Sequence, residues 1–115
     1  MPSTAPQIKD DELYRLLRDG KIDEFNTRRS SGESCDLTGA DFRGVDLTGI
    51  DADGLDLSNS YFRMSNLRGI DFTNTQLEGA SIHGAQISGV FFPVALDANE
   101  ILLSLEHGTR MRYKG

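Results

Sequence analysis

The sequence predicts an all-β solenoid, in which about three square coils of chain stack on one another around a narrow apolar core. Two observations support this fold class. Apolar residues recur at every fifth position between residues 35 and 94, and Gly or Asn ends most of the five-residue units. Only 37% of the 115 residues are hydrophobic, which is low for a globule with a conventional core. A fold with an economical core is therefore needed.

The repeat runs without a gap through twelve consecutive pentapeptides. They are CDLTG, ADFRG, VDLTG, IDADG, LDLSN, SYFRM, SNLRG, IDFTN, TQLEG, ASIHG, AQISG and VFFPV. The first residue of each unit is small or apolar, and the last is Gly in eight units and Asn in two. The central residues are all apolar: Leu37, Phe42, Leu47, Ala52, Leu57, Phe62, Leu67, Phe72, Leu77, Ile82, Ile87 and Phe92.

Neither an α-helix nor a flat strand fits a period of five. In a helix, five residues at about 100° each would spread the apolar position over every face. In a strand, an odd period would reverse the apolar side at each unit. A bend after each short extended segment removes the conflict, because the first and central residues then point inward and the final Gly or Asn adopts positive φ. Four bends of about 90° close one coil, so residues twenty apart, such as Leu47 and Leu67, should stack.

These units resemble those of the pentapeptide-repeat family, in which a small residue and Asp or Asn precede a central apolar residue. The resemblance covers residues 35–94 and implies a right-handed quadrilateral parallel β-helix. It implies little about activity, because members of the family do many different things.

The flanking segments predict short α-helical caps at both ends of the coils, since an open solenoid end exposes core and unpaired backbone. We expect an N-terminal helical cap over 1–34, the β-helix over 35–94, and a C-terminal capping helix with a basic tail over 95–115. Asp97 and Glu100 have capping-box spacing, and Gly108 is placed to end the last helix. The alternative role for this helix is a homodimer contact.

The sequence contains no constellation of residues typical of an enzyme. It has no Cys or His metal cluster, phosphate-binding loop, dinucleotide motif or nucleophile elbow, so we expect no catalysis and no cofactor or metal. The single Cys35 has no partner for an internal disulfide. Because the first residues lack a secretion signal and no segment is long enough to span a membrane, we expect a cytoplasmic protein with no membrane contact.

The second residue of the early units is Asp, in an outward position before the central residue. A paired-carboxylate site is one interpretation of this column. We favour a structural role, in which each short acceptor satisfies N–H groups at the corner. The members are Asp36, Asp41, Asp46, Asp51 and Asp56.

The outward residues predict an electrically two-sided surface, with acidic residues on two adjoining faces and basic residues on the others. The repeat is weakest at SYFRM, where Tyr and Met replace the usual Asp and Gly. Exposed Tyr, Met and Arg are enriched at interface cores, although drift in a solvated face is the alternative. The predicted partner-binding surface is Arg43, Tyr61, Arg63, Met64, Arg68 and His83. A possible second contact is Arg110, Arg112 and Tyr113.

The leading functional hypothesis is a non-enzymatic protein–protein interaction module with a charge-patterned surface and an unidentified protein partner. The resemblance implies one alternative: some family members mimic DNA, bind type II topoisomerases such as gyrase, and confer quinolone resistance. Three coils at about 4.8 Å span only about 14 Å, against roughly 34 Å for a turn of DNA. A weak nucleic-acid or anionic-ligand binder is a third class, although the net charge of −6 argues against nucleic acid.

Overall fold

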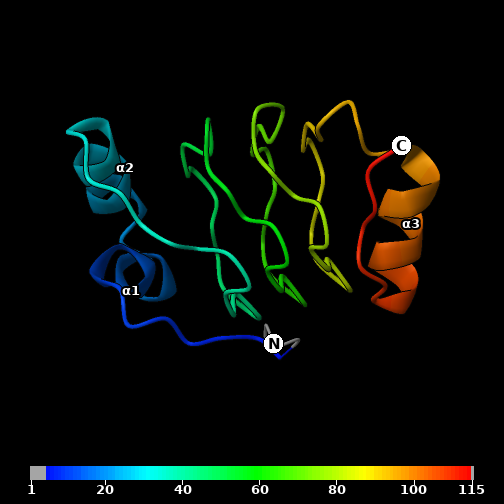
Figure 1. Cartoon of the computed structure of the whole chain (residues 1–115), viewed down its shortest axis with the longest axis horizontal. Coiled ribbons are helices and arrows are strands. Elements are labelled where there is room, and N and C mark those ends of the chain that lie inside the picture. Colours follow the sequence, from blue (N-terminus) through cyan, green and yellow to red (C-terminus); the bar gives the residue numbers. More distant parts are fainter. Residues whose placement is uncertain (1–4, 115) are drawn as a thin grey trace.

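The structure is a computed structural model and describes residues 5–114, so residues 1–4 of the predicted N-terminal cap and residue 115 of the predicted tail lie outside it. Helix α1 (Glu12–Arg18) and helix α2 (Ile22–Ser30) precede the repeats, and helix α3 (Ala98–His107) follows them. Figure 1 shows α1 and α2 at one end of the stacked coils and α3 at the other. The helices thus lie at the two ends where the coils would otherwise expose their core.

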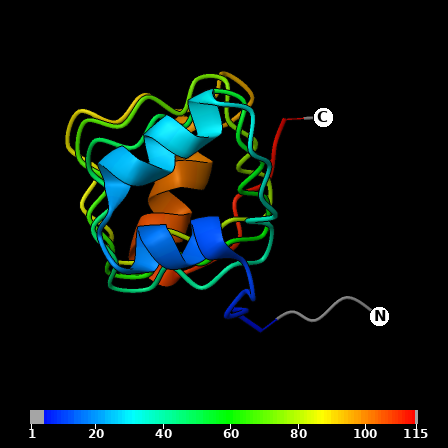
Figure 2. The same ribbon diagram turned by 90° about the vertical axis from the view of Figure 1, so that its left-hand side faces the viewer.

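The coils contact one another through single parallel bridges between residues twenty apart in sequence. Asp41 pairs with Tyr61, and Tyr61 pairs in turn with Ser81. Seen along the stacking direction, the chain follows a roughly square outline (Figure 2). Across residues 5–114 these bridges stay isolated, and no continuous strand forms. The predicted sheet faces are reduced to single bridges because each extended segment is cut short by the next turn.

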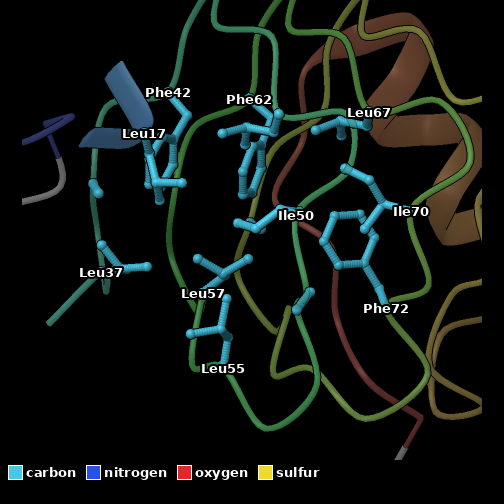
Figure 3. Packing of buried hydrophobic residues seen from close by; sticks show 14 of the residues in the cluster. Leu17, Leu37, Phe42, Ile50, Leu55, Leu57, Phe62, Leu67, Ile70 and Phe72 are labelled. Atoms are coloured by element: carbon cyan, nitrogen blue, oxygen red, sulfur yellow. The ribbon is translucent and has the colours of Figure 1, made fainter. Parts of the chain in front are cut away.

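The predicted stacking of core residues is confirmed. Leu37, Leu57 and Leu77 are each 1% exposed, and the Phe42 and Phe62 rings stack with centroids 5.4 Å apart. Leu47 donates its N–H to the carbonyl of Asn66, the residue before Leu67, at 3.0 Å. Figure 3 shows the side chains of Leu37, Leu57, Phe42 and Phe62 pointing into the interior of the coils. The positions of the apolar residues in the sequence therefore predict correctly which residues of each unit point inward.

Polar residues at the first position of a unit are also buried. The hydroxyl of Ser60 donates to the carbonyl of Leu37 at 2.6 Å, and that of Thr75 to the carbonyl of Ala52 at 2.7 Å. Each hydroxyl donates to a carbonyl of the neighbouring coil, so its burial leaves no hydrogen-bond donor without a partner.

Positive φ occurs at the unit-ending Gly residues and at Asn59, as predicted, but Asn74, which was predicted to share this conformation, does not adopt it. Among the described residues, Asn59 (φ 62°) and Met64 (φ 59°) are the non-glycine residues in this region. Each lies against the glycine of the next coil. A Cβ built on Gly79 would lie 2.1 Å from the Asn59 side chain, and one on Gly84 would lie 2.5 Å from Met64 Sδ. Gly79 and Gly84 therefore provide both conformation and space.

The outward Asp column has the expected structural role. In one unit after another, the carboxylate accepts from the N–H two residues later and from the hydroxyl of the same residue. Asp46 Oδ1 accepts from Thr48 N at 2.9 Å and from Thr48 Oγ1 at 2.7 Å. The Thr48 hydroxyl is the main cause that lowers the pKa of Asp46 below its ordinary value. These carboxylates stabilise the corners, and all members of the column except the buried Asp41 remain at the surface.

Helices α1 and α2 cover the first coil. The Asp11 side chain caps α1 by accepting from Tyr14 N at 3.0 Å. Leu17 and Phe25 are completely buried, and the Tyr14 ring packs against Phe42 with centroids 5.4 Å apart. The core column that begins with Phe42 therefore continues into the cap.

Helix α3 covers the last coil through the apolar packing of Ile101 and Leu105 and through a polar contact. The Ser104 hydroxyl is buried and accepts the N–H of Ile82 at 3.0 Å. Gly108 ends the helix at φ 75°, as predicted. The expected capping box is not formed: within the described residues the Asp97 side chain makes no cap hydrogen bond, and Glu100 accepts from Arg112 instead. The Arg112 guanidinium binds the Glu100 carboxylate, which therefore does not cap the start of α3.

Extended segments beside both caps pair with the same corner of the coils. Gln7 accepts the N–H of Asp41 at 2.8 Å, and Met111 donates its N–H to the carbonyl of Ala80 at 2.9 Å. Met111 is completely buried. The predicted basic tail is therefore packed on the third coil through at least this residue, and the domain boundaries inferred from sequence stay predictions.

Replacement of Leu67 by Ala should lower the free energy of unfolding by about 2 to 5 kcal/mol, because it opens a cavity in a narrow core. Thr48→Ala should lower it much less, because Thr48 lies on the outer side of the coil. Denaturant titration followed by circular dichroism measures both changes. Similar losses for the two variants would contradict the assigned phase.

Thr48→Val should raise the pKa of Asp46 toward its ordinary value, because the donating hydroxyl is removed. The stability that Asp46 contributes is present above its ordinary pKa and is lost as the pH falls through the lowered pKa. Titration of the side-chain carboxyl signals by NMR measures the change. Asp71, whose own partner Thr73 is unchanged, is the internal control and should titrate as in the wild type. An unchanged Asp46 would contradict the assigned hydrogen bond.

Candidate protein-interaction surface

Two of the predicted surface arginines lie side by side on adjoining coils. Arg43 and Arg63 occupy the same outward place, and Gly44 donates its N–H to the carbonyl of Arg63 at 2.8 Å. His83 is next in this column, since Met64 donates its N–H to the carbonyl of His83 at 2.9 Å. The five-residue period thus lines up basic residues that are twenty positions apart.

These arginines border an open depression of about 480 Å³, which we call the basic depression. Its lining residues are Arg18, Asp41, Arg43, Gly44, Arg63 and Met64. Arg18 comes from the end of α1 and was not predicted as a site residue. The position of Arg18 beside the coils depends on how the N-terminal cap packs against them. The repeat pattern does not predict that packing.

Asp41 organises the basic depression. Its carboxylate accepts from Arg43 Nε and Nη2, both at 2.9 Å, and its carbonyl accepts from Arg18 Nη1 at 3.1 Å. The Tyr14 hydroxyl donates to the same carbonyl at 2.6 Å. The hydrogen bonds from Arg43 hold the pKa of Asp41 below its ordinary value. Two arginines are therefore fixed in direction by one buried, ionised residue.

Arg63 and Met64 form the outer part of the basic depression. Within residues 5–114, the Arg63 side chain makes no hydrogen bond or ion pair. The adjacent Met64 is 64% exposed while its backbone is held at φ 59°. This pair therefore presents an accessible cation beside an accessible apolar side chain.

Tyr61, a member of the predicted surface, does not line the basic depression and contacts the C-terminal segment. Its ring is partly buried beneath the Arg110 guanidinium, whose central carbon lies 5.2 Å from the ring centroid. Arg110 also donates to the Tyr61 hydroxyl and, at 3.2 Å, to Asn59 Oδ1. The predicted main surface and the predicted second contact thus meet at Tyr61 and Arg110.

The other two tail residues are engaged within the molecule. Arg112 Nη2 donates to Glu100 Oε2 at 2.9 Å. The Tyr113 hydroxyl accepts the N–H of Leu77 at 2.9 Å and donates to the carbonyl of Thr75 at 3.3 Å. These interactions fasten the C-terminal segment to α3 and to the third coil.

His83 and Arg68 are not among the residues that line the basic depression. His83 is partly buried against the end of α3, and a Cβ built on Gly108 would lie 3.4 Å from His83 Cβ. Its Nδ1 is buried without a hydrogen-bond partner in the described part of the chain. Arg68 is exposed on the adjoining face near Asp46, whose pKa it helps to lower. The structure therefore divides the predicted surface into separate parts.

The acidic residues gather elsewhere. A small depression of about 120 Å³ is lined in part by Asp51, Asp53 and Asp71, and Asn74 Nδ2 donates to Asp53 Oδ1 at 3.0 Å. In the portion of the chain that the structure covers, no three His, Cys, Asp or Glu residues are grouped to hold a metal ion. Likewise, none of the described helices is long and apolar enough to cross a bilayer.

Comparison with known proteins identifies the repeat. The family model for pentapeptide repeats matches residues 17–49 and 56–92, with eight copies. The match extends into α1 and α2, where the structure is helical. No curated protein and no solved structure matches the chain. The matched ranges cover more than half of the sequence, so the chain belongs to the pentapeptide-repeat family.

Proposed function

We propose that this chain is a protein–protein interaction module that receives a partner at the basic depression. Pentapeptide-repeat proteins are generally non-enzymatic structural or interaction modules. Here the contact surface is formed by Arg18, Arg43, Arg63 and Met64. The coils serve as a scaffold that holds these side chains at fixed spacing.

The observation that carries this proposal is the conformation of Met64. A left-handed backbone costs an ordinary L-residue roughly 1 kcal/mol or more, and Gly adopts it without that cost. Met64 adopts this strained conformation while 64% of the residue stays exposed to solvent. Local strain held at a surface position supports a functional role. An exposed Met offers a polarizable, adaptable contact to a partner.

The surroundings of Met64 also suit an interface. Arg and Met are enriched at the cores of protein interfaces, and Arg is prominent among residues that carry binding energy. Arg63 is available because no side-chain partner within residues 5–114 holds it. Arg43 is already oriented by Asp41, so less side-chain entropy is lost when a partner binds.

The proposed scaffold is a right-handed quadrilateral β-helix, the fold that the family generally adopts. The single parallel bridges between residues twenty apart support it. DNA mimicry toward gyrase receives less support. The longest extent of the molecule is 36 Å, and it includes the helices at both ends, so the coils alone are shorter than one turn of DNA, roughly 34 Å.

Partner capture with the double variant Arg63→Gln, Met64→Gly tests the interaction site. Gly fits the backbone at position 64, and Arg63 has no side-chain partner in the described chain, so the variant should fold. Recovery of proteins that bind the wild type specifically should fall by about tenfold or more, as for the loss of interface anchors. Quantitative mass spectrometry of the captured proteins measures the loss.

Arg68→Gln is the matched control, because Arg68 is an exposed arginine in the next unit but outside the depression. It should recover the same proteins as the wild type. If the folded double variant captures the same proteins in the same amounts, the site assignment is wrong.

We also propose that α3 mediates a homodimer. Leu102 and Leu103 on this helix are 50% and 41% exposed, although Ile101 and Leu105 pack against the core. Burial of such residues against a second copy would remove apolar surface from water. The two leucines lie on the terminal helix, beyond the last coil (Figure 1), where a second molecule has access.

Leu102→Gln combined with Leu103→Gln should shift the chain from dimer to monomer in analytical ultracentrifugation. Gln has a high helix propensity, so the helical signal in circular dichroism should be unchanged. A wild-type chain that sediments as a monomer at high micromolar concentration would refute the dimer.

A further inference from the structure

We propose that the basic depression binds a phosphate monoester, carried on a phosphorylated side chain of the partner protein. The inference rests on the proposed function, because it specifies the chemistry that the partner presents there. Arg18, Arg43 and Arg63 would hold the phosphate oxygens, and Met64 would contact the neighbouring part of the peptide.

The charge of the depression matches a dianion. The three guanidinium groups contribute three positive charges and the Asp41 carboxylate one negative charge, which leaves a local excess of two positive charges. A phosphorylated Ser, Thr or Tyr carries a charge of about −1.5 to −2 near neutral pH. A single Glu or Asp side chain of a partner would neutralise only half of the excess.

The donors are fixed in place before any ligand binds. Asp41 holds Arg43 through Nε and one Nη2 hydrogen bond, which leaves the other side of that guanidinium open. Arg18 is anchored through Nη1 to the Asp41 carbonyl. The side chains of Arg18 and Arg43 are nevertheless 36% and 52% exposed. Anchored yet accessible guanidinium groups suit bidentate recognition of phosphate.

The arrangement leaves the Arg63 charge without a nearby carboxylate in the described part of the chain. Arg43 and Arg63 are in register on neighbouring coils, where like charges repel each other. Asp41 compensates Arg43 and approaches Arg18 at 3.9 Å, but the structure brings no carboxylate to Arg63 within its described residues. A phosphate between the arginines would relieve this repulsion. This gives Arg63 a specific role as the group that responds to ligand.

The surroundings favour a peptide over a nucleotide as the carrier of the phosphate. As far as the structure describes the chain, the lining of the depression includes no aromatic side chain on which a base could stack. The nearby Tyr14 ring is only 1% exposed. The overall charge of −6 opposes the approach of a polyanionic nucleic acid. The exposed thioether of Met64 instead suits an apolar residue beside a phosphorylated one.

Fluorescence anisotropy with degenerate fluorescein-labelled phosphoserine peptides tests the proposal on the full chain. The matched probes are the same peptides with Ser or Glu in place of phosphoserine. We expect the phosphorylated peptides to bind about tenfold more tightly than either. Arg63→Gln should weaken their binding by about tenfold, as expected from losing a charge-assisted hydrogen bond. Arg68→Gln, the matched control, should bind like the wild type.

Competition distinguishes the sources of the phosphate group. Unlabelled phosphoserine peptide should displace the probe at lower concentration than inorganic phosphate or adenosine monophosphate. Stronger displacement by the nucleotide would overturn the assignment to a peptide. Equal affinity for phosphorylated and unphosphorylated peptides, or unchanged binding by a folded Arg63→Gln variant, would overturn the phosphate site.

The failure of this inference can be told apart from failure of the proposed function. If partner capture depends on Arg63 and Met64 but phosphorylated peptides bind no better than their Ser and Glu counterparts, the interaction site stands and the phosphate site is wrong. If capture depends on neither residue, the proposed function itself is wrong.

Discussion

The right-angle bend after every fifth residue is the constraint on which the rest of the structure depends. At most corners it uses a backbone at positive φ, which Gly adopts freely, and it is reinforced where an outward Asp accepts from the corner N–H, as Asp46 does from Thr48. Side chains alternate between the two sides of an extended segment, and each bend cancels the reversal that an odd repeat would cause. The same positions of every unit therefore point inward, and the same positions point outward. Core columns, such as the stacked Phe42 and Phe62, and surface columns, such as Arg43 and Arg63, are two results of the same geometry.

That local origin explains what sequence reasoning could predict. The central residues, the corner positions and the role of the Asp column all follow from interactions within one unit or between positions twenty apart. The stacking of Leu47 beneath Leu67 could therefore be derived from the period alone. Continuous strands could not be expected to persist, because the extended part of each unit is too short for more than single bridges.

Contacts between the repeat and its flanks were not predictable in the same way. Arg18 reaches the coils because α1 docks at a particular angle, and Arg110 covers Tyr61 because the C-terminal segment returns along the third coil. His83 was expected to be outward, and it is, but the end of α3 covers it. These features depend on tertiary packing, for which the five-residue period has no signal.

Gln7 and Met111 both pair with residues of one corner column, so the number of coils determines how the two terminal segments are oriented relative to each other. Gln7 lies against the first coil at Ala40, and Met111 lies against the third at Ala80, forty residues further along. Whole circuits can therefore be added or removed while both terminal segments keep their orientation. A change of a single pentapeptide would instead rotate one end by a quarter turn relative to the other. Length variation in such a molecule should be quantised in steps of one circuit.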